Sequence, residues 1–335
     1  MRHTTSWLGV LGALVPVVLG LSVMVGAVSL PLGEIVAVLS GRATDPTAAT
    51  ILMQIRLPRV LLAALVGGAL GLCGAVMQGL FRNPLADPYL LGIASGATAG
   101  AAVVIALHLD IYWGAVPLGA FIGGVLAVGI VYRIAQTRWA QLDNYALILS
   151  GVALAALFSA ITSFLLFYSG ASHDARRLIF WILGGLGGAQ WVYVFGLLGV
   201  LIIAGMVLML FARDLNALAL GEEMAAHLGI EPRDLRRVLL FTVTALTAVA
   251  VAVSGTIGFV GLIVPHILRL SVGPDHRVLL PASALGGAIL LTLCDTLART
   301  VLAPAELPIG IITALLGAPF FLFLLRRRAQ LGALL

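Results

Sequence analysis

The chain has 335 residues, of which 61% are hydrophobic and only 10% are charged, and its mean hydropathy is +1.14. Soluble domains hold about 45–50% apolar and about 25% charged residues, because water must be able to solvate their surface. All 19 basic residues are arginines, and they lie in short loops between apolar runs, so the net charge of +5 indicates a membrane protein and not a nucleic-acid-binding one.

Ten predominantly apolar stretches approach or exceed the roughly 20 residues that a membrane-spanning helix needs. The first is longer than the core of a signal peptide, about 7–15 residues, so we expect it to remain as a helix. The sequence predicts an all-α membrane protein with a single domain over 1–335 and ten transmembrane helices, at 7–29, 60–81, 89–108, 112–132, 144–168, 191–211, 236–253, 257–271, 278–298 and 308–326.

A further apolar piece, Leu178–Gly188, is too short to cross the membrane. Its last five residues, Gly184-Gly185-Leu186-Gly187-Gly188, can turn sharply. Irregular backbone is tolerated at membrane depth only where protein surrounds it, so we predict a re-entrant or interfacial segment here.

The arginines also set the predicted orientation. With the N-terminus in the cytoplasm, thirteen arginines lie on the inner side and six on the outer side, in agreement with the positive-inside rule. Both termini are therefore expected in the cytoplasm. Ten spans can form two five-helix halves, and an odd number of spans inverts the second half relative to the first. The one sizeable inner loop, 212–235, is charged and has a helix-forming composition.

The motifs of common enzyme classes are missing from the sequence. Without lysine there is no P-loop, and neither H-E-x-x-H nor Gly-x-Ser-x-Gly occurs. The six histidines are scattered, and Cys73 and Cys294 have no neighbour at metal-ligand spacing. We expect the chain to bind no metal and no cofactor, and we expect no enzymatic activity.

Asp295 is the one carboxylate well inside a predicted span. An ionisable group in a span is a functional hypothesis by default, but Arg299 follows four residues later, so the two could form an ion pair along one helix face. A structural pair is favoured over a proton relay. Since ion-coupled transport needs further intramembrane charge or broken helices, the energy for transport is expected to come from elsewhere.

Several stretches occur in the order and spacing of a known family. They read RLPR at 56–59, MQGLFRNPLADPYLLGIASGA at 77–97, FWILGGLGG at 180–188, LNALALGEEMAAHLG at 215–229, GFVGLIVPHILRL at 258–270, GPDHRVLLP at 273–281 and AELPIGIITALLGAPFF at 305–321. With them the chain resembles, from about residue 50 to 328, the iron-chelate, haem and cobalamin permeases of the FecCD type, membrane subunits of type II ATP-binding-cassette (ABC) importers.

The resemblance implies a set of partners. A second copy of the chain would complete a homodimer around a central pathway in the bacterial inner membrane. Two cytoplasmic ATPase subunits would use ATP and Mg, and a periplasmic binding protein would deliver the substrate. The lipid bilayer surrounds the assembly, and no nucleic acid is expected.

Three sets of residues match the family's functional positions. The first is the ATPase coupling segment, whose apolar and acidic side chains could dock on the ATPase; a membrane-surface helix is the alternative, disfavoured by the acidic pair at 222–223. Its residues are Leu215, Asn216, Ala217, Leu218, Leu220, Gly221, Glu222, Met224, Ala225, Leu228 and Gly229.

The second set, Arg56, Arg59 and Arg299, lies on the outer side and matches arginines that meet acidic groups on the binding protein. Exposed contacts of this kind steer docking and fix its register. The alternatives are anchoring of the helix start for the first two, and the pair with Asp295 for the third.

The third set resembles a cytoplasmic gate and comprises Asn83, Leu85, Asn144 and Tyr145. The tyrosine departs from the small hydroxyl residues that the family often has there. For Asn83, a turn-forming role before Pro84 is an equally good interpretation.

The sequence thus predicts the permease subunit of an ABC importer that moves an iron chelate, haem or a ferric siderophore, from periplasm to cytoplasm. Cobalamin is the alternative cargo. An ion-coupled secondary transporter is the alternative from a different class.

Overall fold

The computed structural model describes residues 2–26, 28, 30–42, 45–136, 143–169 and 172–332, and in these ranges the chain is helical with connecting turns. The α-helices are α1 (Arg2–Met24), α2 (Leu32–Leu39), α3 (Pro46–Thr50), α4 (Leu57–Leu80), α5 (Ile93–Ala106), α6 (Ala115–Ala135), α7 (Asn144–Ser169), α8 (Ser172–Leu183), α9 (Trp191–Leu210), α10 (Ala212–Leu220), α11 (Glu222–His227), α12 (Pro232–Ser254), α13 (Val260–Val272), α14 (His276–Thr300) and α15 (Ile309–Gly332). A π-helical turn, η1 (Ile51–Arg56), joins α3 to α4, and two 3-10 turns are η2 (Pro88–Leu91) and η3 (Leu109–Ile111).

Seven of the described helical segments are long and apolar enough to cross a membrane, and α5, α13 and the apolar part of α15 are shorter apolar helices. A helix occupies each of the ten predicted stretches. The prediction for the second span was wrong at its start, because a continuous helical segment begins at Pro46 and not at residue 60. The charges of Arg56 and Arg59 interrupt the run of apolar residues there. Both side chains are buried within the protein, and the helix continues through them.

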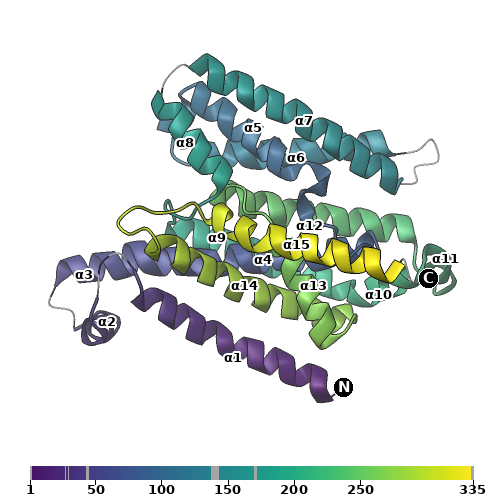
Figure 1. Cartoon of the computed structure of the whole chain (residues 1–335), viewed down its shortest axis with the longest axis horizontal. Helices are drawn as coiled ribbons and strands as arrows, with labels where there is room; N and C mark the ends of the chain where they lie inside the picture. Colours follow the sequence, from purple (N-terminus) through teal and green to yellow (C-terminus); the bar gives the residue numbers. More distant parts are fainter. Residues whose placement is uncertain are drawn as a thin grey trace.

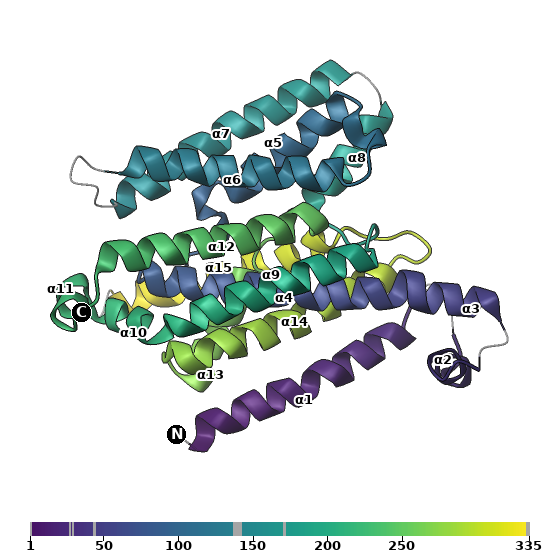
Figure 2. The ribbon, with the colours of Figure 1, turned by 180° about the vertical axis from the view of Figure 1, so that it is seen from behind.

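The helices lie side by side in a bundle (Figure 1). α5, α6 and α7 form a layer on one side, α4, α9, α12 and α14 lie in the middle, and α1 is outermost on the opposite side, an order that the reverse view repeats (Figure 2). The start of α1 and the end of α15 lie at the end of the bundle that carries α10 and α11. We call it the inner end, and the opposite end, which carries α2, α3 and α8, the outer end.

α4 is the centre of the bundle, with 20 of its 24 residues buried. Its glycines allow α14 to approach so closely that the two backbones touch. A Cβ atom added at Gly67 would lie 2.2 Å from the carbonyl oxygen of Gly287, and one added at Gly71 would lie 2.2 Å from that of Ser283. Small residues at such crossings are the usual means by which membrane helices associate, so α4 and α14 form the rigid core of the subunit.

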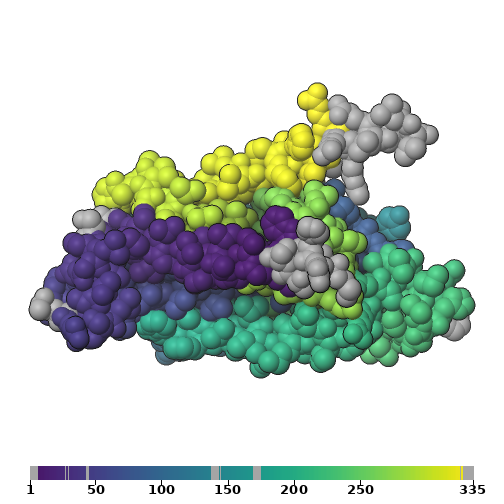
Figure 3. Space-filling view, turned by 90° about the horizontal axis from the view of Figure 1, so that it is seen from below, coloured from purple at the N-terminus to yellow at the C-terminus, as the bar shows by residue number. Residues whose placement is uncertain are grey.

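α1 contributes little to this core. It lies across the face seen in Figure 3, between α15 on one side and α9 on the other, and most of its described side chains are exposed. A hydrogen bond of 2.7 Å joins the hydroxyls of Ser22 and Thr296, near the outer ends of α1 and α14. α1 is therefore attached to the bundle chiefly along α14.

Two of the short helices begin in the same unusual way. α5 has 14 residues and α13 has 13, so each spans about 20 Å, less than the roughly 30 Å of a bilayer core. Each follows an irregular segment that ends in a left-handed residue, Gly92 at φ 77° and Phe259 at φ 69°. The two segments meet, because the Tyr89 hydroxyl donates a hydrogen bond of 3.0 Å to the Ile257 carbonyl.

Candidate functional site

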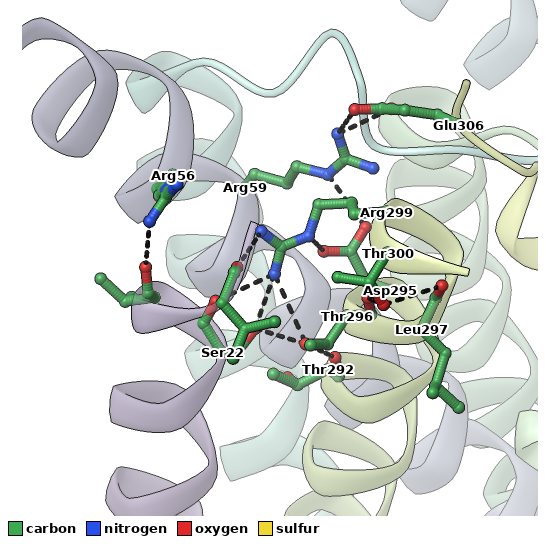
Figure 4. A network of polar contacts seen from close by, with 12 residues as sticks. Ser22, Arg56, Arg59, Thr292, Asp295, Thr296, Leu297, Arg299, Thr300 and Glu306 are labelled. Atoms are coloured by element: carbon green, nitrogen blue, oxygen red, sulfur yellow. Dashed lines mark hydrogen bonds and ion pairs between the residues drawn. The ribbon is translucent and has the colours of Figure 1, made fainter. Parts of the chain in front are cut away.

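A buried charge network occupies the outer end of the α4–α14 core (Figure 4). The Asp295 side chain is fully buried, and its Oδ1 accepts a hydrogen bond of 2.9 Å from Arg59 Nε. Its Oδ2 lies 3.0 Å from Arg299 Nε, one turn along α14. Two guanidinium groups therefore share one carboxylate. An unpaired carboxylate would be costly in the interior, and two cations compensate its charge.

Glu306 extends the network toward the surface. Arg59 Nη1 donates to both carboxylate oxygens of Glu306, at 2.9 Å each, and the Glu306 side chain is 48% exposed. The Arg59 guanidinium group thus binds the buried Asp295 on the interior side and the half-exposed Glu306 on the surface side. Glu306 was not among the predicted site residues, although it lies within the AELPIG stretch of the sequence motif.

The other two arginines bind the outer end of α1. Arg299 donates to the carbonyls of Ser22 and Val25 at 3.0 Å each. Arg56 donates to the Val23 carbonyl at 3.0 Å and also to the Val28 carbonyl. The last carbonyls of a helix have no partner within it and carry partial negative charge, so cations stabilise this end.

The prediction that these three arginines are exposed was wrong. The exposed fractions of Arg56, Arg59 and Arg299 are 4%, 6% and 5%, because each guanidinium group binds acceptors of its own chain. The alternative for Arg299 is confirmed, because it pairs with Asp295 along α14. Arg56 and Arg59 do not anchor the start of their own helix, since Arg56 binds carbonyls at the end of α1 and Arg59 binds the carboxylates of Asp295 and Glu306. Their role in docking a partner remains a prediction.

A cavity of about 360 Å³ lies beside this network, with Arg59 and Glu306 in its wall. The glycine-rich segment 184–188 forms another part of the wall. Its backbone is held at its first two residues: Gly185 N–H donates to the Ser254 carbonyl at 2.8 Å, and the Gly184 carbonyl accepts from Ile309 N–H at 3.0 Å. The segment predicted to be re-entrant or interfacial therefore joins α8 to the ends of α12 and α15.

The predicted coupling loop folds into α10 and α11 at the inner end, separated by Gly221 at φ 132°. The residues predicted to couple to an ATPase fall into two groups. Those toward the bundle are buried or partly buried: Leu215, Asn216, Ala217, Leu218 and Ala225. Leu220, Met224 and Leu228 instead expose 75%, 50% and 62% of their surface, next to Glu222 and Gly229.

Arg236 fixes α11 against α12 by an ion pair of 2.6 Å with Glu222. Since Arg236 is buried and the Glu222 side chain is half exposed, the carboxylate marks the boundary between bundle and surface. The exposed face of α11 is thus both apolar and acidic. We call Leu220, Glu222, Glu223, Met224 and Leu228 the α11 face.

The predicted gate residues lie in two places. Asn83 Oδ1 accepts a hydrogen bond of 3.1 Å from Leu85 N–H, which supports its turn-forming interpretation. Tyr145 is exposed in the first turn of α7. Asn144 begins α7, but its side chain lies outside the described residues. The gate itself remains a prediction.

Within the described residues, no group of three His, Cys, Asp or Glu side chains is arranged to hold a metal ion. The two sites that the structure forms contain charged side chains. Arginines and carboxylates lie together at the outer end, and glutamates lie among exposed apolar side chains at the inner end.

The chain is similar to several known transport proteins. It is 48% identical to a cobalamin import system permease protein, BtuC, of Halobacterium salinarum, over 84% of this chain and 75% of the relative. It is 45% identical to the hemin transport system permease protein HmuU of Yersinia pestis, over 84% of each.

A solved metal-chelate type ABC transporter in an inward-facing conformation is 33% identical with a TM-score of 0.84, covering 96% of this chain and 98% of that one. PsaBC of Streptococcus pneumoniae shares the fold at 20% identity, with a TM-score of 0.56, over 86% of this chain and 94% of that one. The model of the FecCD transport family matches residues 14–327. This multi-pass membrane protein therefore belongs to the FecCD transport family.

Proposed function

We propose that this chain is the permease subunit of an ABC importer, with ten transmembrane helices in two inverted halves of five. Family membership is the observation that carries the proposal. The short helices α5 and α13 support the two halves, because each is the third helix of its half and each begins after a left-handed residue. Interrupted helices in corresponding positions are typical of transporters with inverted repeats.

The energy would come from a separate ATPase that uses ATP and Mg and binds the α11 face. Exposed leucine and methionine side chains on a short helix can fill an apolar groove of a partner. Glu222 and Glu223 favour a protein over the anionic inner surface of a membrane. The positive-inside rule places the inner end, with both termini, in the cytoplasm of a bacterial inner membrane.

The outer end would receive a periplasmic binding protein at the network of Arg56, Arg59 and Arg299. Three arginines there face two carboxylates, Asp295 and Glu306. The excess positive charge would attract acidic side chains of a partner and fix its register. Because Glu306 is half exposed, it is the group that such a partner would displace.

A second copy of the chain would complete the pathway for the cargo, with Asn83, Leu85, Asn144 and Tyr145 at its inner gate. The cargo would be a large metal chelate. An iron chelate, haem or a ferric siderophore, is our first expectation from the sequence, but the similar identity to relatives named for cobalamin and hemin keeps cobalamin as the alternative. Both of these cargoes are metal-bound tetrapyrroles.

The test is reconstitution of this chain with a co-purifying ATPase and a periplasmic binding protein. Proteoliposomes are offered haem, a ferric siderophore or cobalamin, each on the binding protein. Uptake of one cargo, and none when the binding protein is left out, supports the proposal and identifies the substrate. Replacing Met224 of the α11 face by Glu should abolish co-purification of the ATPase, whereas replacing exposed Arg213 on α10 by Ala should not. Equal co-purification for both variants would contradict the assigned docking face.

A further inference from the structure

A compact hydrogen-bonded joint connects α10 to the first turn of α14. Asn216 Oδ1 accepts from the backbone N–H of His276 at 2.9 Å and lies 2.6 Å from His276 Nδ1. Since an amide oxygen can only accept, that imidazole nitrogen carries the proton. Asn216 Nδ2 donates to Asp275 Oδ1 at 2.8 Å. One amide side chain thus uses both of its ends on the start of α14.

The histidine of this joint is buried, and charged side chains lie at the edge of the joint. His276 is 1% exposed, and Asp275 caps α14 by accepting from the Arg277 backbone N–H at 3.0 Å. The Arg277 guanidinium also binds this carboxylate and lowers the pKa of Asp275 below its usual value. Asn216 therefore donates to an ionised carboxylate, and hydrogen bonds to charged groups are stronger than those between neutral groups.

α4 completes the joint from a third direction. A Cβ atom at Gly79 would lie 2.5 Å from His276 Nε2, so only glycine leaves room for the imidazole. α10, α14 and α4 therefore meet at this one histidine. The buried Leu215 and Leu218 hold α10 against the bundle on either side of Asn216.

α14 connects the joint to the outer charge network. It has 25 residues and is therefore about 38 Å long. Its first residue is His276, and Asp295 and Arg299 lie near its other end. Because its glycine contacts with α4 join the two backbones closely, a displacement at its inner end moves α14 and α4 together as one body.

We propose that Asn216 is a positioning residue that transmits movement of α10 and α11 to α14, and through α14 to the outer charge network. It does so without touching the ATPase, because its side chain is directed to His276 and Asp275 and not to the α11 face. The inference rests on the proposed function, since movement at the α11 face would come from the bound ATPase. Loss of the joint is expected to separate ATP hydrolysis from transport.

The test is the amount of cargo imported per ATP hydrolysed in proteoliposomes with the complete importer. Asn216→Ala removes all three contacts, and Ala is a better helix former than Asn, so α10 itself is not weakened. Gly79→Ala disturbs the same histidine from α4. Arg213→Ala, a truncation of an exposed residue on α10, is the matched control.

We expect both joint variants to lower the cargo imported per ATP about tenfold, the scale of losing a hydrogen bond to a charged group, while the control stays within about twofold. Misfolding would lower uptake and hydrolysis together and leave the ratio unchanged, so the ratio is compared only for variants that hydrolyse ATP at the parental rate. A parental ratio in such joint variants overturns the inference, as does loss of ATPase binding by Asn216→Ala. If the unmodified complex shows no ATP-dependent uptake, the proposed function itself fails.

Discussion

Replacing Asp295 by Asn should destabilise the protein strongly, because it removes the one fully buried carboxylate between Arg59 and Arg299. The substitution keeps the size of the side chain, so no cavity forms and the effect is electrostatic. Breaking a buried ion pair from one side costs about 3–5 kcal/mol, because a buried charge loses its partner. Here two guanidinium groups lose the same partner, which favours the upper part of that range.

The expected change in melting temperature follows from the size of the chain. Unfolding entropy is about 2.1 cal/mol/K per residue, so for a chain of this length the loss corresponds to about 4–7 °C. Cys73 and Cys294 are free and buried, so a thiol-reactive fluorescent dye reports their exposure as the detergent-solubilised protein is heated. The two sites lie on α4 and α14, the helices that the network joins.

The control is an ion pair at the protein surface. Asp234 is 69% exposed and lies 4.0 Å from Arg237, and such surface pairs contribute about 0–1 kcal/mol. Asp234→Asn should therefore leave the melting temperature within about 1 °C of the parent. Equal melting temperatures for the Asp295 and Asp234 variants would refute the assignment of Asp295 as the structural centre of the outer network.

Two further predictions concern the α4–α14 core. Gly67→Ala places a methyl group against the Gly287 carbonyl and should lower the stability by about 1–3 kcal/mol in the same thermal assay. Its control is Gly196→Ala on α9, where nothing lies within 4 Å and the change should be neutral or stabilising by up to about 1 kcal/mol. A larger loss of stability for Gly196→Ala than for Gly67→Ala would contradict the close approach of the two helices. Asp275→Ala removes the cap of α14, at a cost of about 0.5–2 kcal/mol. Because Arg277 lowers the pKa of Asp275, the carboxylate stabilises the fold above its ordinary pKa and loses this effect only as pH falls through the lowered value. The melting temperatures of the parent and this variant should therefore differ equally at pH 8 and pH 5, and a difference that disappears by pH 5 would contradict the ionised cap.

Hydropathy was a sufficient guide to the helices that face lipid. α6, α7 and α9 begin and end within a few residues of the predicted spans, because lipid requires uninterrupted apolar side chains. Hydropathy did not predict the start of a helix correctly where charged side chains are buried inside the protein. By hydropathy, the second span should begin after Arg56 and Arg59. Both lie inside a continuous helical segment, because their partners come from α1, α14 and the loop before α15.

The candidate site was predictable in part. The spacing of Asp295 and Arg299 gave their ion pair directly, since residues four apart share a helix face. The partners of Arg59 lie 236 and 247 residues away in the chain, and no local pattern could pair them. In the same way, the motif identified the coupling segment, but only the packing of α10 separated Asn216, turned inward, from the exposed α11 face.

The most direct test of the transport mechanism compares ATP with ion gradients as the source of energy. Proteoliposomes holding the chain, its ATPase and the cargo-loaded binding protein are given either internal ATP and Mg, or a proton or sodium gradient without ATP. An ABC importer predicts uptake with ATP alone, unchanged when ionophores dissipate the gradients. Uptake that follows an ion gradient and needs no ATP would contradict it and identify a secondary transporter.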